Sequence, residues 1–129
     1  MNRGSITILA MTGVLTLCLF ALGAADLGAM VTARARAQAA ADAAALAAAV
    51  AQVEILGHPD DPASVAQEEA GRNGARVTRC ECEPGDVVAT VWVELLPRLT
   101  LIAPWFDRPA RAVARAAVDP DVLSYRDDG

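Results

Sequence analysis

The chain has 129 residues and a formal net charge of −5 at pH 7, and although 54% of its residues are hydrophobic only 4% are aromatic, so its apolar content is aliphatic. This length has room for one small domain, and the apolar residues are concentrated near the N-terminus. The acidic balance and the lack of a basic cluster in the rest of the chain exclude nucleic acid as a partner, because such binding needs a concentrated cationic surface.

An uncharged stretch, residues 5–25, follows a short leader at residues 1–4. About twenty apolar residues cross a hydrocarbon core of about 30 Å as one helix, so we expect residues 5–25 to be a transmembrane segment. A cleaved signal peptide is the alternative, since Arg3 supplies a positive charge before the apolar run and small residues near its end could fit a peptidase site. The run is longer than the apolar core of a signal peptide, about 7–15 residues, which favours a retained span.

The helix is expected to continue beyond the membrane. No proline interrupts the sequence from Ser5 to Val53, so the simplest interpretation is one helix of about fifty residues whose second half, residues 26–56, protrudes from the bilayer. The Gly-His-Pro step at residues 57–59 ends it, because glycine favours a left-handed cap and the residue before proline resists the helical region.

Polar residues follow one side of the protruding helix. Arg34, Gln38 and Asp42 are spaced four apart, so they share a face on which they can pair. They form either a solvated stripe or a row that hydrogen-bonds to the folded domain or to a neighbouring subunit. Asp26, at the outer end of the span, is expected to be solvated at the membrane interface, and the alternative is a charge pair with Arg34 or with a neighbouring helix.

Alanine recurs at every fourth position from Ala21 to Ala49, and Ala33 and Ala37 lie just outside the expected span. A seam of small side chains lets helix backbones approach closely, so these two positions are candidate contacts with another helix. Because the whole segment is rich in alanine, composition alone is the alternative explanation of the repeat.

The rest of the chain predicts a small domain, residues 57–118, followed by an acidic disordered tail at residues 119–129. Asp61 can cap a short amphipathic helix that has Pro62 at its first position. The pair Asn73-Gly74 should end this helix.

Two strand candidates follow, residues 75–82 and 87–96, and a Glu-Pro-Gly-Asp turn sequence joins them as a hairpin. Alternation in the second strand predicts an inward face of Val87, Ala89, Val91, Val93 and Leu95. Residues 110–118 could be a helix or a third strand. Since two strands alone are only marginally stable, we expect an α+β fold in which the long N-terminal transmembrane helix continues outside the membrane and packs on a small antiparallel sheet with one short helix.

The residue types needed for catalysis do not come together in this sequence. The single histidine, His58, lies in a loop between glycine and proline, and no nucleophile, base and orienting group are aligned. Cys80 and Cys82 are the one reactive-looking pair, but zinc needs about four ligands at defined spacing. A local disulfide, an intermolecular disulfide and free thiols all stay open for them. We therefore expect no enzymatic activity, no cofactor or metal, and no small-molecule substrate.

Several short motifs coincide in the first half of the chain. Arg3-Gly4-Ser5 enters the apolar span, Asp26-Leu27-Gly28 marks its outer end, and Ala33-Arg34 leads into the alanine-rich run from Gln38 to Leu46. With these motifs, residues 5–49 resemble the N-terminal segment of the TadE/TadG-like proteins of Flp pilus-assembly systems. The remainder, with its Asn73-Gly74 step into a hairpin, is similar to the small actinobacterial members of that family.

The resemblance implies a pseudopilin or minor pilin in the cell membrane, with a cytoplasmic N-terminus, an extracytoplasmic C-terminal domain, and other pilin-like or Tad-system subunits as partners of its N-terminal helix. It also implies a candidate processing site between Gly4 and Ser5. Pilin-type precursors often carry Glu at the fifth residue after the processing glycine, and Leu9 stands there in this chain. Cleavage and entry into a fibre therefore stay open. The alternative function is a single-pass, membrane-anchored binding or regulatory module unrelated to pili.

Overall fold

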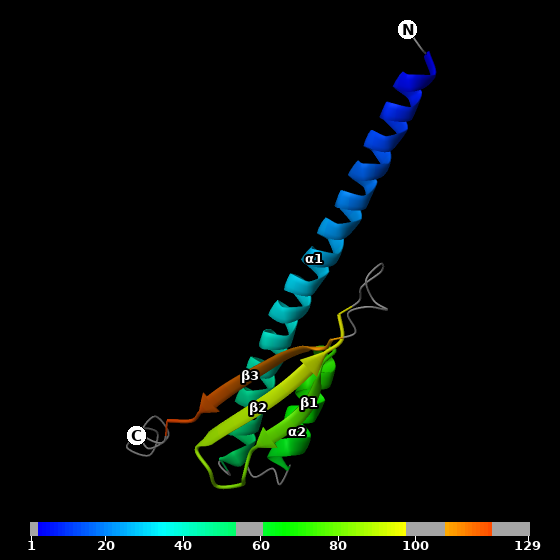
Figure 1. The fold of residues 1–129 in the computed structure, drawn as a ribbon. Coiled ribbons are helices and arrows are strands. Elements are labelled where there is room, and N and C mark those ends of the chain that lie inside the picture. Colours follow the sequence, from blue (N-terminus) through cyan, green and yellow to red (C-terminus); the bar gives the residue numbers. More distant parts are fainter. Residues whose placement is uncertain (1–2, 54–60, 98–107, 120–129) are drawn as a thin grey trace.

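The computed structural model describes residues 3–53, 61–97 and 108–119. In chain order these ranges contain α1 (Arg3–Gln52), α2 (Pro62–Arg72), β1 (Arg76–Glu81), β2 (Val88–Leu95) and β3 (Ala110–Ala117). The expected α+β fold, a long apolar helix with a short helix and an antiparallel sheet, is confirmed (Figure 1). The predicted helix end at residues 57–59 and the tail beyond Asp119 lie outside the described residues.

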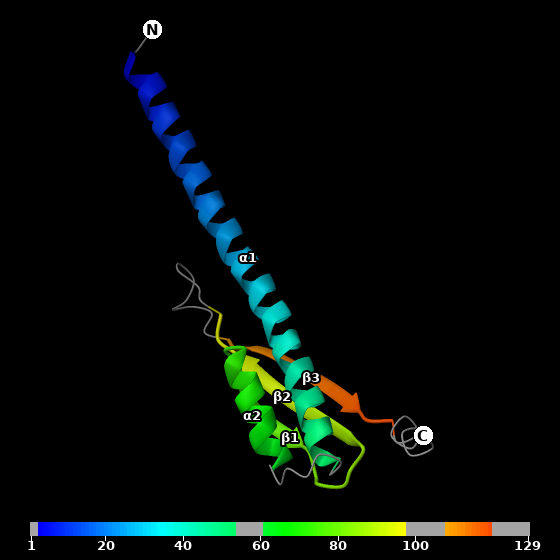
Figure 2. The same ribbon diagram turned by 180° about the vertical axis from the view of Figure 1, so that it is seen from behind.

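α1 is one continuous helix, as the lack of proline predicts, and it is long and apolar enough to cross a membrane once. Its N-terminal half stands clear of the other elements, and its C-terminal half lies against them (Figures 1 and 2). The side chains of residues 4–22 are exposed on every side of the helix. A helix that is apolar all round needs an apolar surrounding, which is either protein or lipid.

The C-terminal half of α1 and the whole of α2 cover one face of the sheet (Figure 2). The buried side chains of α1 are all alanines apart from Asp26 and Gln52. They include Ala37, Ala40, Ala41, Ala44, Ala45, Ala48 and Ala49, and they pack in one core with Ala89, Val91 and Val93 of β2. Because alanine adds little more than a methyl group, the helix backbone can lie close to the strands over several turns.

α2 begins and ends where the sequence predicts. The Asp61 carboxylate accepts a hydrogen bond from the Ser64 backbone N–H at 3.2 Å, and Pro62 occupies the first helical turn, where its missing N–H costs nothing. Asn73 caps the other end, and Gly74 follows with φ of +72°, a left-handed conformation that favours glycine. The buried side of this helix consists of Pro62, Ala66 and Ala70.

The sheet has the order β1-β2-β3, and both pairings are antiparallel. Between β1 and β2 the chain turns as predicted: Gly85 has φ of +93°, and the Asp86 N–H donates to the Glu83 carbonyl at 3.1 Å. Of the two structures predicted for residues 110–118, a helix or a third strand, residues 110–117 form the strand. Its register places Ala114 opposite Val91 and Val113 opposite Trp92.

The inward face of β2 is confirmed at its centre and wrong at its start. Ala89, Val91 and Val93 are buried, but Val87 is 48% exposed. The physical reason is that β2 begins at Val88, so Val87 belongs to the end of the turn, where its carbonyl accepts a hydrogen bond from the Val118 N–H at 2.9 Å. The pleat therefore does not orient its side chain.

Replacing Val91 with Asp should unfold the domain formed by the sheet and the helices packed on it, because this side chain is 0% exposed and an unpaired carboxylate there costs about 4 kcal/mol or more. The measurement is protease resistance of the domain in membranes. The control is Val113→Asp on the opposite face of the same sheet, where the side chain is 46% exposed and the fold should survive. A Val91→Asp protein as resistant as the wild type would contradict the packing of α1 on β2.

Candidate functional site

The exposed apolar half of α1 is a candidate interaction surface. Its large aliphatic and aromatic side chains between Ile6 and Leu22 are all exposed. Monomeric soluble proteins rarely expose apolar surface of this extent, so a bilayer or a partner must cover it. The surface belongs to a helix, whose backbone groups are satisfied internally, as a lipid surrounding demands.

The polar side chains in this half suit the same surrounding. Thr12 donates its hydroxyl hydrogen to the Ile8 carbonyl at 2.8 Å, and Thr16 donates to the Thr12 carbonyl at the same distance. Each hydroxyl is thus satisfied one turn back along its own helix. Threonine therefore presents mainly its methyl group outwards, which lowers the cost of placing it in hydrocarbon.

Asp26 lies at the junction between the two halves of α1, and the expectation that it is solvated at the interface is wrong. Its side chain is 2% exposed. The reason lies in helical spacing: Ala33 is two turns further on and Ala37 one turn beyond that, so all three lie on the side of α1 that faces the domain. Arg34 lies on another side, is exposed, and forms no ion pair with any residue that the structure describes.

The row of Arg34, Gln38 and Asp42 is only partly joined. The Gln38 amide Nε2 donates to Asp42 Oδ1 at 3.0 Å and to the Val113 carbonyl of β3 at 3.4 Å. This places one hydrogen bond between α1 and β3 in addition to the apolar contact. Gln38 therefore hydrogen-bonds to the folded domain, as one of the two predicted alternatives has it. Arg34 is exposed to solvent, as the other alternative has it.

Gln52 is a buried anchor that the sequence did not single out. Its side-chain Nε2 donates to the Glu83 carbonyl at 2.9 Å and to the Val88 carbonyl at 3.4 Å. The backbone carbonyl of Gln52 accepts a hydrogen bond from the Gly85 N–H at 3.2 Å. The end of α1 is thereby bonded to both sides of the hairpin turn. The one signal for this role was a polar residue at the end of an alanine-rich helix.

Cys80 and Cys82 are joined by a disulfide, with their Cα atoms 5.4 Å apart. Of the three open alternatives the structure shows the local bridge. Both residues face the core, Cys82 as a buried member and Cys80 packed against it. Among residues 3–53, 61–97 and 108–119, no group of three or more His, Cys, Asp or Glu is placed to hold a metal ion.

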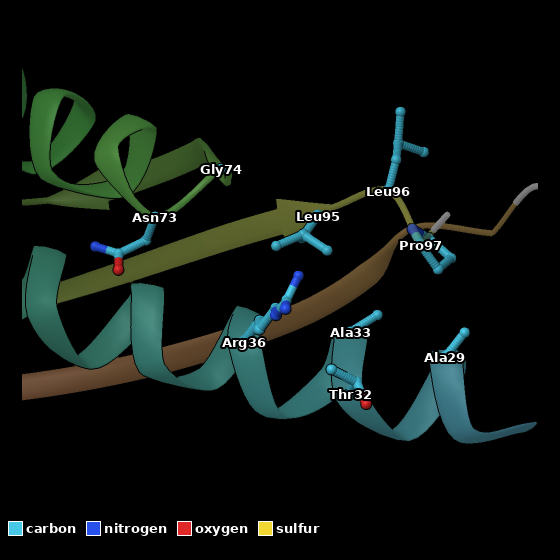
Figure 3. Close-up of a pocket in the computed structure, with 9 residues that line it drawn as sticks. All are labelled: Ala29, Thr32, Ala33, Arg36, Asn73, Gly74, Leu95, Leu96 and Pro97. Carbon is cyan, nitrogen blue, oxygen red and sulfur yellow. The ribbon is translucent and has the colours of Figure 1, made fainter. Parts of the chain in front are cut away.

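Two hollows of about 410 Å³ flank α1 where it enters the domain. They share Ala33 and Pro97, and each contains at least one arginine. In the hollow beside α2 the Arg36 side chain rises from α1 toward Leu95 (Figure 3). The hollow on the other side lies between α1 and the start of β3 and contains Arg34 and Arg108.

A protein-family model matches the chain within α1. Residues 4–51 match the family model of putative Flp pilus-assembly TadE/G-like proteins. This TadE/G-like segment begins and ends within α1, so it includes both the exposed apolar half and the alanine face that is buried in the domain. Comparison with curated proteins and with solved structures finds no match.

The position of the alanines changes the interpretation of the seam. Ala33 is 5% exposed and Ala37 is 0% exposed, and Ala37 belongs to the core between α1 and the sheet. They are helix-packing positions within one chain and are not available to a neighbouring chain. From Ala33 to Ala49 the repeat is buried, Ala29 is half-buried, and Ala21 and Ala25 are exposed.

Replacing Ala37 with Leu should therefore destabilise the domain by about 1–3 kcal/mol, since the added methylenes have no space between α1 and the sheet. Protease resistance or urea unfolding of the inserted protein measures this effect. Ala39→Leu is the matched control, because Ala39 is exposed on the same helix. Equal stability of the two variants would show that α1 is not packed on the domain as described.

Replacing Gln52 with Leu keeps the side chain's size but removes the donor of both carbonyl hydrogen bonds, so the domain should lose about 1–3 kcal/mol. Amide hydrogen exchange should rise first in the turn at residues 83–86. Gln67→Leu, on the exposed side of α2, should leave both stability and exchange unchanged. Unaltered exchange in the Gln52 variant would refute the anchoring role.

Proposed function

We propose that the chain is a non-enzymatic, membrane-anchored, pilin-like component of a Tad-type Flp pilus-assembly or secretion system, of the pseudopilin or minor-pilin kind. The observation that carries the proposal is the match of residues 4–51 to the TadE/G-like family, which coincides with a helix whose first half is apolar and uncovered. The match supports a pilus-related role, and the shape of the chain supports anchoring.

In this proposal α1 performs two tasks with one uninterrupted element. The exposed half inserts into the membrane and supplies the surface for neighbouring subunits, while the buried half is the spine of the outer domain. A subunit contact made within the bilayer is therefore transmitted to the domain without a hinge. No chemical step is required of the chain, whose role is lateral packing.

The orientation we propose has the N-terminus in the cytoplasm and the domain outside. The disulfide between Cys80 and Cys82 supports it, because disulfides persist in oxidising compartments and are rare where cellular thiols are kept reduced. The bridge belongs to the outer domain, and the exposed thiol of Cys18 lies in the span. In this orientation the candidate processing site at Gly4 and Ser5 faces the cytoplasm.

The partner surface within the membrane is proposed to be the exposed part of the alanine repeat, Ala21 and Ala25, together with Gly28. A methyl group added at Gly28 would meet no atom within 4 Å, so the backbone is open on that side. Small residues spaced four and seven apart let a second helix approach closely in lipid, where packing rather than the hydrophobic effect drives association.

The test is a photo-crosslinking residue at Val14, which lies on the same side of α1, in membranes of a host that assembles Flp pili. Wild-type chain should form adducts with a second copy or with another pilin-like subunit. Replacing Ala21 and Ala25 with Leu should lower the yield about five-fold, the effect of about 1 kcal/mol on an association constant, while insertion is unchanged.

The control for added bulk is Thr16→Leu, on the opposite side of the helix, which should retain the wild-type adducts. Deletion of the protein should in addition reduce the number of surface pili. A chain that inserts but forms no adducts, and whose deletion leaves pili unchanged, would favour an anchored module unrelated to pili.

A further inference from the structure

We propose that the hollow between α1 and the start of β3 binds the phosphate of an anionic phospholipid, and that this contact seats the outer domain on the bilayer surface. The inference rests on the membrane insertion proposed above, but it assigns a lipid-binding site to the domain itself. The occupant is a lipid of the membrane that holds the span.

The composition of the hollow changes along the helix in the way a phospholipid requires. Along α1 the lining nearer the span is aliphatic, with Leu27, Met30 and Val31, and Arg34 follows nearer the domain. Arg108 enters the same hollow from the segment that precedes β3. Leu27 and Val31 are both exposed. An apolar floor followed by two guanidinium groups matches an acyl chain followed by its phosphate.

The position of the hollow along α1 also places it at the depth of the lipid headgroups. From Arg3 to Arg34 the helix rises about 46 Å, close to the roughly 40–45 Å of a bilayer with its headgroups. With Arg3 at one surface, Arg34 reaches the headgroup level of the other. Leu27 lies about 10 Å deeper along the axis, at the edge of the hydrocarbon.

The charges of the hollow are available for a ligand. Three other arginines bond to glutamates: Arg72 to Glu68 and Glu69, Arg76 to Glu94, and Arg79 to Glu81. Within the described part of the chain, Arg34 and Arg108 form no such pair, and both are exposed. A guanidinium presents paired donors that fit two phosphate oxygens, so two arginines in one hollow can hold a phosphate from two sides.

Residues near the hollow also favour contact with an anionic lipid surface. Asp26, the one acidic residue of α1 before Asp42, is 2% exposed and so presents little of its carboxylate to the lipid surface. On the other side of α1, Arg36 lines the second hollow, and Leu96 beside it is exposed. The end of the domain that faces the span therefore combines aliphatic side chains with cations, the combination typical of an interfacial contact.

The experiment uses the full chain in nanodiscs that contain equal amounts of phosphatidylglycerol and phosphatidylcholine, with native mass spectrometry to count the lipids that stay bound. The wild type should retain phosphatidylglycerol preferentially. Replacing Arg34 and Arg108 with Gln should lower that preference by about twenty-five-fold, about five-fold for each arginine. Replacing both with Lys should keep part of it.

The charge-matched control is Arg79→Gln with Arg115→Gln on the open face of the sheet, which should retain the full preference. A second measurement needs no variant: the wild-type preference should fall when the salt concentration is raised from 50 to 500 mM, since the contact is electrostatic and exposed. Protease resistance verifies that each variant is folded.

Three results would overturn the inference. The first is an inserted wild-type chain with no preference for the anionic lipid, which would leave the proposed function intact. The second is displacement of the lipid by millimolar inorganic phosphate, which would indicate a site for free anions. The third is failure of the wild-type chain to float with vesicles, which would refute both membrane anchoring and this site.

Discussion

The close approach between the second half of α1 and the sheet is the contact on which the rest of the structure depends. The buried face of this three-stranded sheet carries few and small side chains, and it is covered by the helices. Alanines on the helix allow the backbone to lie near β2 and β3, and α2 fills the remaining width above β1. Bulkier side chains on α1 would raise it from the sheet and remove the cover from Val91 and Val93.

This arrangement explains why one helix has two surfaces of different kinds. In the C-terminal half of α1, the side that meets the sheet consists of small residues, and larger ones such as Leu46 and Val50 face away from the sheet. In the N-terminal half, large aliphatic side chains cover the whole circumference of the helix. The change occurs between Asp26 and Ala33, where burial begins, and the hollows with their arginines lie at the same level.

Features that depend on neighbours in sequence could be predicted, and features that depend on the tertiary fold could not. The continuity of α1, the Asp61 cap and the Gly85 turn follow from local rules for proline, capping and positive φ. The burial of Asp26 could not be derived, because it depends on which side of α1 meets the domain. The same holds for the role of Gln52, whose partners are about thirty residues away.

The candidate site was likewise predicted from the sequence in part. The resemblance of residues 5–49 to the TadE/TadG-like family is confirmed by the family model that matches residues 4–51. The role of α1 as the element that contacts neighbouring subunits is a proposal. The alanine repeat alone did not tell whether its members pack within the chain or between chains. The structure separates them, since Ala37 is covered by the domain and Ala21 is not.

In the proposed membrane-spanning arrangement, the unbroken course of α1 makes it a lever that pivots at the membrane surface. From Arg34, at the level of the lipid headgroups, to Gln52 the helix extends about 27 Å. Spans are tilted by about 20° on average, and a change of that size would swing the far end of the domain sideways by about 9 Å. Because the domain is packed along this arm and bonded to its tip at Gln52, it would travel as a whole. Small adjustments of helix angle within the bilayer would thus be read out as large displacements at the distal hairpin turn.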